Sequence, residues 1–170
     1  PGYTDPETKV FYNGLHIKGY AHRARHYFNK HTQKACPLIS EELYDTIMKH
    51  GDAIEAHMDL RRNWLFTYNA MTKFIKGQYL LSEYKYIKDQ KPGKTIRAKG
   101  PPIETPQHLY MRVALFLFPD NLEDAFKLYD LMSLHYATMA TPTLFNAGTP
   151  KPQCASCFLV STKGDDLNDI

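Results

Sequence analysis

The chain has 170 residues, 43% of them hydrophobic, which suits one globular domain with a real core. Its 21 Lys and Arg residues against 18 Asp and Glu residues give a net charge of +3, too small an excess to indicate nucleic-acid binding by itself. No stretch approaches the roughly 20 consecutive apolar residues of a membrane helix, so we expect no membrane contact.

The histidines and cysteines argue against two common kinds of site. The 8 His residues lack the compact spacing of metal ligands, so we predict no metal site. The 3 cysteines, an odd number, fit a reducing cytosol better than a disulfide scaffold. We therefore predict a cytoplasmic protein.

Residues 1–39 carry the weakest pattern. Apolar residues recur at helical spacing from Leu15 to Phe28, so we expect this N-terminal segment to be helical. Arginine and histidine side chains share that helix, namely His22, Arg23, Arg25 and His26. They could form a basic face for phosphate or for a partner, but a solvated helix face is the favoured interpretation.

A second helix is predicted to begin at Ser40, whose hydroxyl can cap exposed N–H groups, and to end at Gly51. Residues Asp59–Asn63 are predicted to be a charged connector. A third helix is predicted over Phe66–Ile75, ended by Gly77.

The segment 84–102 is polar and rich in lysine, with Pro92-Gly93 at its centre, and predicts an exposed hairpin or loop. Six Lys and Arg residues lie between Lys85 and Lys99, beside two tyrosines. Basic residues interleaved with aromatic ones can bind single-stranded nucleic acid, but a solvated insertion is the favoured interpretation.

Two further helices are predicted before residue 140. Thr105-Pro106 is a capping hydroxyl followed by proline, and the run Leu109–Phe118 is apolar nearly all round, which predicts a buried helix ended by Pro119. Asn121 is predicted to cap the next helix. An apolar stripe at helical spacing indicates its core face, namely Leu122, Phe126, Tyr129, Met132 and Tyr136.

The last part of the chain is predicted to be a turn-rich loop, Thr141–Pro152, followed by a short strand, Cys157–Ser161. Asp165 or Asp166 can cap a new helix. Other strong strand candidates are missing, and neither a lone strand nor a single helical turn is stable alone. We therefore expect a truncated piece of a longer protein, inactive alone and dependent on a complementary polypeptide.

Residues Thr141–Leu159 read T-P-T-L-F-N-A-G-T-P-K-P-Q-C-A-S-C-F-L. The string resembles the large, catalytic subunit of class I ribonucleotide reductase, whose members carry a pattern close to S/T-P-T-L-F-N-A-G-T, then P-Q-x-S-S-C-F-L. A fainter resemblance runs back to about Ser40, through F-T-Y-N at 66–69, G-Q-Y-L-L at 77–81 and E-T-P-Q-H-L-Y-M-R at 104–112. Residues 1–39 match poorly.

The resemblance implies a mainly α fold. Residues 40–140 would form the helical N-terminal domain, with the basic loop 84–102 inserted. Residues 141–170 would begin the ten-stranded α/β barrel, with a substrate loop, the first strand and the first turn of a helix. It also implies an oxidoreductase that makes deoxyribonucleotides for DNA replication, reducing ribonucleoside diphosphates by a radical route with a redox cysteine pair.

The resemblance assigns the candidate catalytic and substrate residues. By motif position, Cys157 corresponds to one member of the redox pair, whose partner is absent from this chain. Thr141, Ser156 and Cys157 correspond to positions that hold the substrate. Taken singly, such residues would more often be a buried inert thiol and turn or cap hydroxyls. Asn146 and Gly148 are expected to shape the loop rather than touch substrate.

The resemblance also implies effectors and partners. Asp165, Asp166 and Leu167 align with the start of the specificity site, which binds a deoxynucleoside triphosphate or ATP; Asp165 could instead only cap its helix. Relatives usually have Ser at the position of Asp166. Implied partners are the rest of the large subunit, a second copy in a homodimer, a metal-containing small subunit that generates the radical, and thioredoxin or glutaredoxin. We expect no cofactor bound directly by this chain.

Cys154 departs from the family pattern, which usually has an apolar residue there. With Cys157 it forms C-x-x-C, which could be half a zinc site or a local redox pair, although an incidental cysteine is favoured. Two alternatives to the class I assignment stay open. One is a cobalamin-dependent ribonucleotide reductase, and the other is a helical module that binds zinc or nucleic acid.

Overall fold

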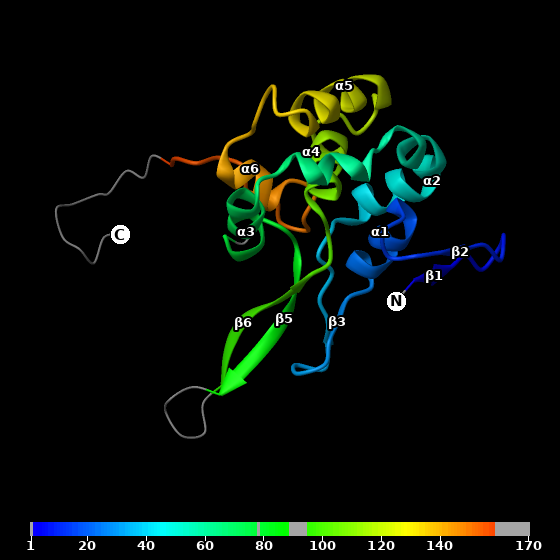
Figure 1. The fold of residues 1–170 in the computed structure, drawn as a ribbon. Coiled ribbons are helices and arrows are strands. Elements are labelled where there is room, and N and C mark those ends of the chain that lie inside the picture. The colour runs from blue at the N-terminus through cyan, green and yellow to red at the C-terminus, as the bar shows by residue number, and fades with distance from the viewer. Residues whose placement is uncertain (1, 78, 89–94, 159–170) are drawn as a thin grey trace, which may run out of the picture.

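The computed structural model describes residues 2–77, 79–88 and 95–158, and this part of the chain is mainly helical (Figure 1). The helices are α1 (Ile17–Arg25), α2 (Glu41–His57), α3 (Tyr68–Lys76), α4 (Pro106–Leu117), α5 (Leu122–Ser133) and α6 (Thr141–Asn146), with a 3-10 helix η1 (Leu60–Leu65). The strands form antiparallel pairs: β1 (Tyr3–Thr4) with β2 (Phe11–Tyr12), β3 (Phe28–Asn29) with β4 (Lys34–Ala35), and β5 (Ser82–Lys88) with β6 (Thr95–Pro102).

Helix α4 is the centre of the core. Its apolar side chains are buried along almost its whole length, and α2, α5, α6 and η1 contact it. The predicted start is confirmed: the Thr105 hydroxyl accepts the backbone N–H of His108, and His108 Nδ1 accepts that of Thr105 at 3.2 Å. This reciprocal cap satisfies two N–H groups that a helix start leaves unpaired.

Hydroxyl and amide caps begin other helices as predicted. Ser40 Oγ accepts the Leu43 N–H at 3.2 Å, and Asn121 Oδ1 accepts the Asp124 N–H at 3.1 Å. The apolar stripe of α5 is correct for Tyr129, which is fully buried. It is wrong for Tyr136, which is 79% exposed because α5 ends at Ser133.

The predicted end of α2 at Gly51 is wrong, since the helix continues to His57. A Cβ at Gly51 would lie 2.4 Å from Cε of Lys18, whose side chain crosses α2 there to reach Asp52 at 2.8 Å. The glycine therefore permits close packing of α1 on α2 instead of ending the helix. The connector predicted over Asp59–Asn63 is also mostly helical, because it falls in η1.

The basic segment 84–102 belongs to a hairpin, which is one of the two predicted forms. Strands β5 and β6 pair from Ser82 with Pro102 to Lys88 with Thr95, and the pair extends away from the helices (Figure 1). The expectation that other strand candidates were missing is therefore wrong. The N-terminal segment contains the predicted helix, as α1, but also the two short strand pairs β1–β2 and β3–β4.

Candidate functional site

The segment predicted to be a substrate loop begins with a helix instead. Helix α6 spans Thr141–Asn146, with Pro142 in its first turn, where a missing N–H costs no hydrogen bond. Leu144 is 4% exposed and anchors this turn in the core. Turns and bends follow over residues 147–151, so the loop prediction is wrong for 141–146.

The chain then folds back along α6. Asn146 Nδ2 donates to the Gln153 carbonyl at 2.9 Å, and Thr143 Oγ1 donates to the Cys154 carbonyl at 3.5 Å. Asn146 thus shapes the loop through its side chain, as predicted. Cys154 is half-buried by this return.

The residues predicted to meet the substrate lie at the two ends of this folded-back segment. Thr141 is exposed at the start of α6, and Ser156 and Cys157 are exposed beyond the return, with Ser156 Oγ 3.8 Å from Cys157 Sγ. Within the described residues, no hydrogen bond joins Thr141 to Ser156 or Cys157. Cys157 and Phe158 are not in a strand, and the rest of the predicted strand lies outside the described residues.

Arg112 of α4 fixes the end of α6. Its Nη2 donates to the Leu144 carbonyl at 3.1 Å, and its Nη1 donates to the Ala147 carbonyl at 2.5 Å. The last carbonyls of a helix lack partners within the helix and carry partial negative charge, which a guanidinium complements. Arg112 therefore holds the helix whose continuation carries Cys157.

The Arg112 guanidinium is in turn paired with Glu104 in the core. Nε and Nη2 of Arg112 donate to the two carboxylate oxygens at 3.1 and 2.9 Å, and both side chains are 0% exposed. Glu104 also accepts from the Tyr20 hydroxyl at 2.9 Å and from the Leu81 N–H at 2.7 Å. Burial and the neighbouring carboxylate raise the pKa of Tyr20 well above its usual value, so its hydroxyl keeps its proton. This network joins α1, the base of the β5–β6 hairpin, α4 and α6.

Gly148 completes the turn after α6. Its φ of +71° is left-handed, and a Cβ there would lie 2.6 Å from Cδ2 of Leu43 and 3.1 Å from Cγ of Arg112. Its carbonyl accepts the Ser40 N–H at 2.9 Å. Both the backbone conformation and the space require glycine, which supports a role in shaping the loop.

A second polar cluster, which the sequence analysis did not identify, lies between η1, α2, α4 and α5. Arg62 Nη1 donates to Asp130 at 2.6 Å, and His57 Nε2 lies 3.0 Å from the same carboxylate. Burial opposes ionisation of Asp130, but the bonds from Arg62 and His57 outweigh it, and the Asp130 pKa lies below its usual value. Deeper in, Gln107 Oε1 accepts from the Tyr129 hydroxyl at 2.9 Å, whereas the buried Gln107 Nε2 has no hydrogen-bond partner among the described residues.

Three further predictions concern an effector, a metal ion and a membrane. Asp165, Asp166 and Leu167 lie outside the described residues, so their effector role stays a prediction. Among the residues that the structure describes, no group of three or more His, Cys, Asp or Glu side chains is placed to hold a metal ion. The described helices also include none with the length and apolar character needed to span a bilayer.

Comparison with known proteins identifies a family model and several relatives that match this chain. Residues 65–152 match the family model described as "Ribonucleotide reductase, all-alpha domain". The chain is 41% identical over 145 residues to the ribonucleoside-diphosphate reductase large chain of Schizosaccharomyces pombe, covering 85% of this chain and 16% of that protein. It is 40% identical over 144 residues to large chain 2 of Saccharomyces cerevisiae, and 37% identical over 144 residues to the large subunit of Dictyostelium discoideum; each match covers 85% of this chain and 15% of the relative. The chain therefore spans about a sixth of the length of these relatives.

Proposed function

Because the chain belongs to the family of ribonucleotide reductase large subunits, we propose that it is the N-terminal part of a ribonucleoside-diphosphate reductase. It would supply the helical domain and one redox cysteine of the active site, and residues 141–170 would begin the catalytic barrel. The observation that carries the proposal is the family string ending at an exposed thiol, Cys157, on a segment that Arg112 fixes to the core.

In the proposed reaction Cys157 is one of two thiols that become a disulfide. The carbon–oxygen bond at C2′ breaks, the oxygen leaves as water, and hydrogen takes its place. The two thiols supply two electrons and two protons and form one sulfur–sulfur bond. The radical chemistry that activates C3′ would come from a cysteine elsewhere in the protein. Exposure of Cys157 supports this role, because a redox thiol must meet both substrate and reductant.

Thr141 and Ser156 would bind the substrate in the same site. Their hydroxyls can donate to phosphate oxygens and accept from ribose hydroxyls. Both are exposed, and the hydrogen bonds from Asn146 and Thr143 hold their two stretches of chain together. Binding of ribonucleoside diphosphate would draw Thr141 toward the Ser156–Cys157 pair.

Regulation and partners follow from the same assignment. Asp165, Asp166 and Leu167 would begin a site for a deoxynucleoside triphosphate or ATP effector. The enzyme would work in the cytoplasm as a dimer of large subunits, with a metal-containing small subunit as the radical source and thioredoxin or glutaredoxin as the reductant. Family membership supports each of these assignments.

Cysteine replacement in the full-length enzyme tests the proposal. Cys157→Ser should abolish multiple-turnover reduction while changing substrate affinity little, because serine nearly matches the thiol in shape but cannot form a disulfide. Cys154→Ser is the matched control and should keep most of the activity. Equal loss of turnover in both variants, accompanied by loss of bound zinc, would establish a C-x-x-C metal site instead.

A further inference from the structure

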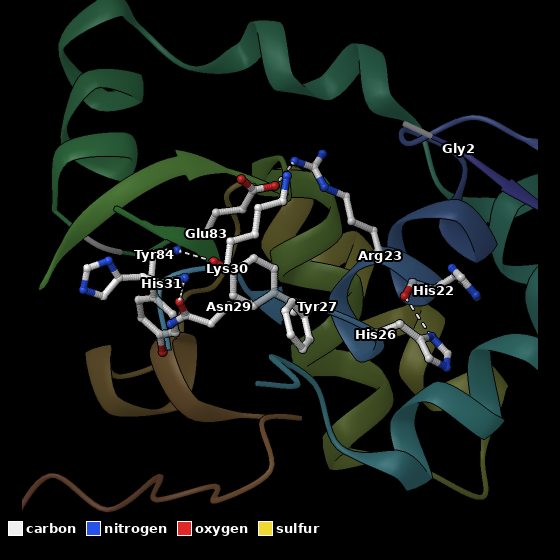
Figure 2. Close-up of a pocket in the computed structure, with 11 residues that line it drawn as sticks. Gly2, His22, Arg23, His26, Tyr27, Asn29, Lys30, His31, Glu83 and Tyr84 are labelled. Carbon is white, nitrogen blue, oxygen red and sulfur yellow. Dashed lines mark hydrogen bonds and ion pairs between the residues drawn. The ribbon is translucent and has the colours of Figure 1, made fainter. Parts of the chain in front are cut away.

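A cavity of about 750 Å³ lies away from the Cys157 segment, beside α1, the β3–β4 turn and the start of β5 (Figure 2). This volume lies within the range of roughly 300–1,000 Å³ that is usual for small-molecule pockets. Ionisable side chains gather on its wall, namely His22, Arg23, His26, Lys30, His31 and Glu83. None of its described lining residues belongs to α6 or to the segment after it, so the cavity is separate from the proposed active site.

The permanent charges of the pocket have a positive excess. Arg23 Nη2 is bonded to the Glu83 carboxylate, which ties α1 to β5. A guanidinium has five N–H donors, so the remaining donors of Arg23 can still serve a ligand. Lys30 is exposed at the β3–β4 turn, and no ion pair joins it to a carboxylate within the part of the chain that is described. Two cations, Arg23 and Lys30, against one carboxylate leave one unbalanced positive charge.

Partly buried hydrogen bonds shape the walls of the pocket. Asn29 is 5% exposed, and its Oδ1 accepts the N–H groups of His31 at 3.0 Å and Thr32 at 3.2 Å, which shapes the turn that carries Lys30. The Tyr84 N–H donates to the Tyr27 hydroxyl at 2.9 Å, which joins β5 to the segment after α1. Lys30 and Arg23 are thus presented by fixed elements and not by loose termini.

The imidazole of His22 stacks on two neighbouring rings beside the pocket. The His22 ring lies 4.3 Å from that of His26 and 4.1 Å from that of Tyr3. Burial and the nearby His26 lower the pKa of His22, so this ring is neutral at pH 7. Because a carbonyl can only accept, His26 Nδ1 donates to the His22 carbonyl at 3.1 Å. A bound anion would favour the protonated form of His22, which lines the pocket.

We infer that this pocket binds the di- or triphosphate group of a small ligand, either as a free polyphosphate or carried on a nucleoside. A guanidinium fork and a lysine ammonium are the usual partners of phosphate oxygens, and they face the cavity from different elements here. A singly charged anion would gain less, because attraction to the net positive charge of the wall grows with the charge of the ligand. The inference does not depend on the proposed reductase activity.

Calorimetric titration of the full-length protein with inorganic pyrophosphate tests the inference. Lys30→Glu should weaken one class of pyrophosphate site by at least about tenfold, because a favourable charge becomes an unfavourable one. Lys34→Glu is the matched control: it makes the same charge change on the same β3–β4 hairpin, on an exposed residue that does not line the pocket. It should change the affinity by no more than about twofold.

A second set of titrations identifies the source of the phosphate. A nucleoside diphosphate that loses affinity in Lys30→Glu, while free pyrophosphate does not bind at this site, would show that the group is carried on a nucleoside. Loss for both probes would show that the phosphates alone suffice. Equal loss in the Lys30 and Lys34 variants, or no saturable phosphate site affected by Lys30→Glu, would overturn the inference. A nucleoside without phosphates that binds in the same Lys30-dependent way would also overturn it.

Discussion

The Arg112–Glu104 cluster and the Arg62–Asp130 cluster both pair an arginine with a carboxylate, but they differ in exposure. Both side chains of the first pair are 0% exposed, whereas Arg62 and Asp130 are 23% and 36% exposed. Water can replace a lost partner in the second cluster and cannot do so in the first. A buried charge without its partner is strongly destabilising, whereas ion pairs with solvent access contribute about 0–1 kcal/mol.

The two clusters also differ in how they are connected to the proposed active site. Arg112 holds the carbonyls at the end of α6, from which the chain continues to Cys157, whereas among the described residues Arg62 donates hydrogen bonds to Asp130 and Ser133 of α5. The buried pair therefore connects the core to the proposed active site. We expect damage to it to alter both folding and catalysis, and damage to the partly exposed Arg62–Asp130 pair to affect stability alone.

The largest expected effect is that of Arg112→Met, which leaves the buried carboxyl group of Glu104 without its cation. The free energy of unfolding should fall by about 3–5 kcal/mol, measured by urea denaturation. The double variant Glu104→Gln/Arg112→Met should recover part of this loss, because it no longer buries a charge. A loss below about 1 kcal/mol for Arg112→Met would contradict the account of the buried pair.

A smaller loss is expected for Gly148→Ala, next to the same arginine. The residue has φ of +71°, and the added Cβ would lie 2.6 Å from Cδ2 of Leu43. Left-handed strain and this contact should lower the free energy of unfolding by about 1–3 kcal/mol. An unchanged urea midpoint for this variant would show that the turn after α6 is not fixed as described.

The next prediction concerns the loss of stability at acidic pH, to which a buried histidine contributes. Burial lowers the pKa of His108, whose Nε2 donates to the Leu15 carbonyl at 2.9 Å. Its pKa in the folded state is below that in the unfolded state, so the unfolded chain binds more protons and stability falls as the pH drops below about 6.5. A single group can contribute a slope of at most about 1.4 kcal/mol per pH unit.

Unfolding by urea between pH 7.5 and 5.5 checks this prediction. His108→Gln should be less stable than the unchanged protein at pH 7.5 but should lose less stability on acidification. His22, whose pKa is also lowered by burial, should contribute in the same direction. Parallel pH profiles for the His108 variant and the unchanged protein would exclude His108 as a source of acid sensitivity.

The smallest effect is expected for Asp130→Asn in the partly exposed cluster. The loss in the free energy of unfolding should be about 0.2–1 kcal/mol, because Arg62 retains access to water. Added salt should shrink this loss, since screening acts on exposed pairs more than on buried ones. A loss as large as that of Arg112→Met would remove the distinction between the two clusters.

Local chemistry predicted the helix starts but not the long-range contacts. Ser40, Thr105 and Asn121 cap their helices as expected, because a cap depends only on residues two or three positions away. Gly51 does not end α2, because its role is set by Lys18 on another helix. For the segment 84–102 the sequence left a hairpin and a loop as alternatives, since lysine-rich strands carry little apolar alternation, and the β5–β6 pairing decides for the hairpin.

The family string predicted the position of the Cys157 segment. Only part of the packing that holds this segment could be predicted from the sequence. Arg112 is the one charged residue in the apolar run Leu109–Phe118, and such a residue is almost never buried without a partner. The sequence alone could therefore have indicated that Arg112 is buried and paired. Its partner Glu104 precedes the helix by two residues and reaches Arg112 only through the fold, so no helical spacing identifies the pair. The α6 carbonyls that Arg112 bonds have no sequence signature at all.

The most direct test of the central claim is to locate the disulfide formed in a single turnover. The full-length enzyme, fully reduced and then given ribonucleoside diphosphate, its small subunit and no external reductant, would be alkylated and digested for peptide mass analysis. The account predicts one disulfide that contains Cys157 for each deoxyribonucleotide formed, with Cys154 still alkylated as a free thiol. Cys157 recovered as a free thiol after turnover, or joined to Cys154, would contradict it.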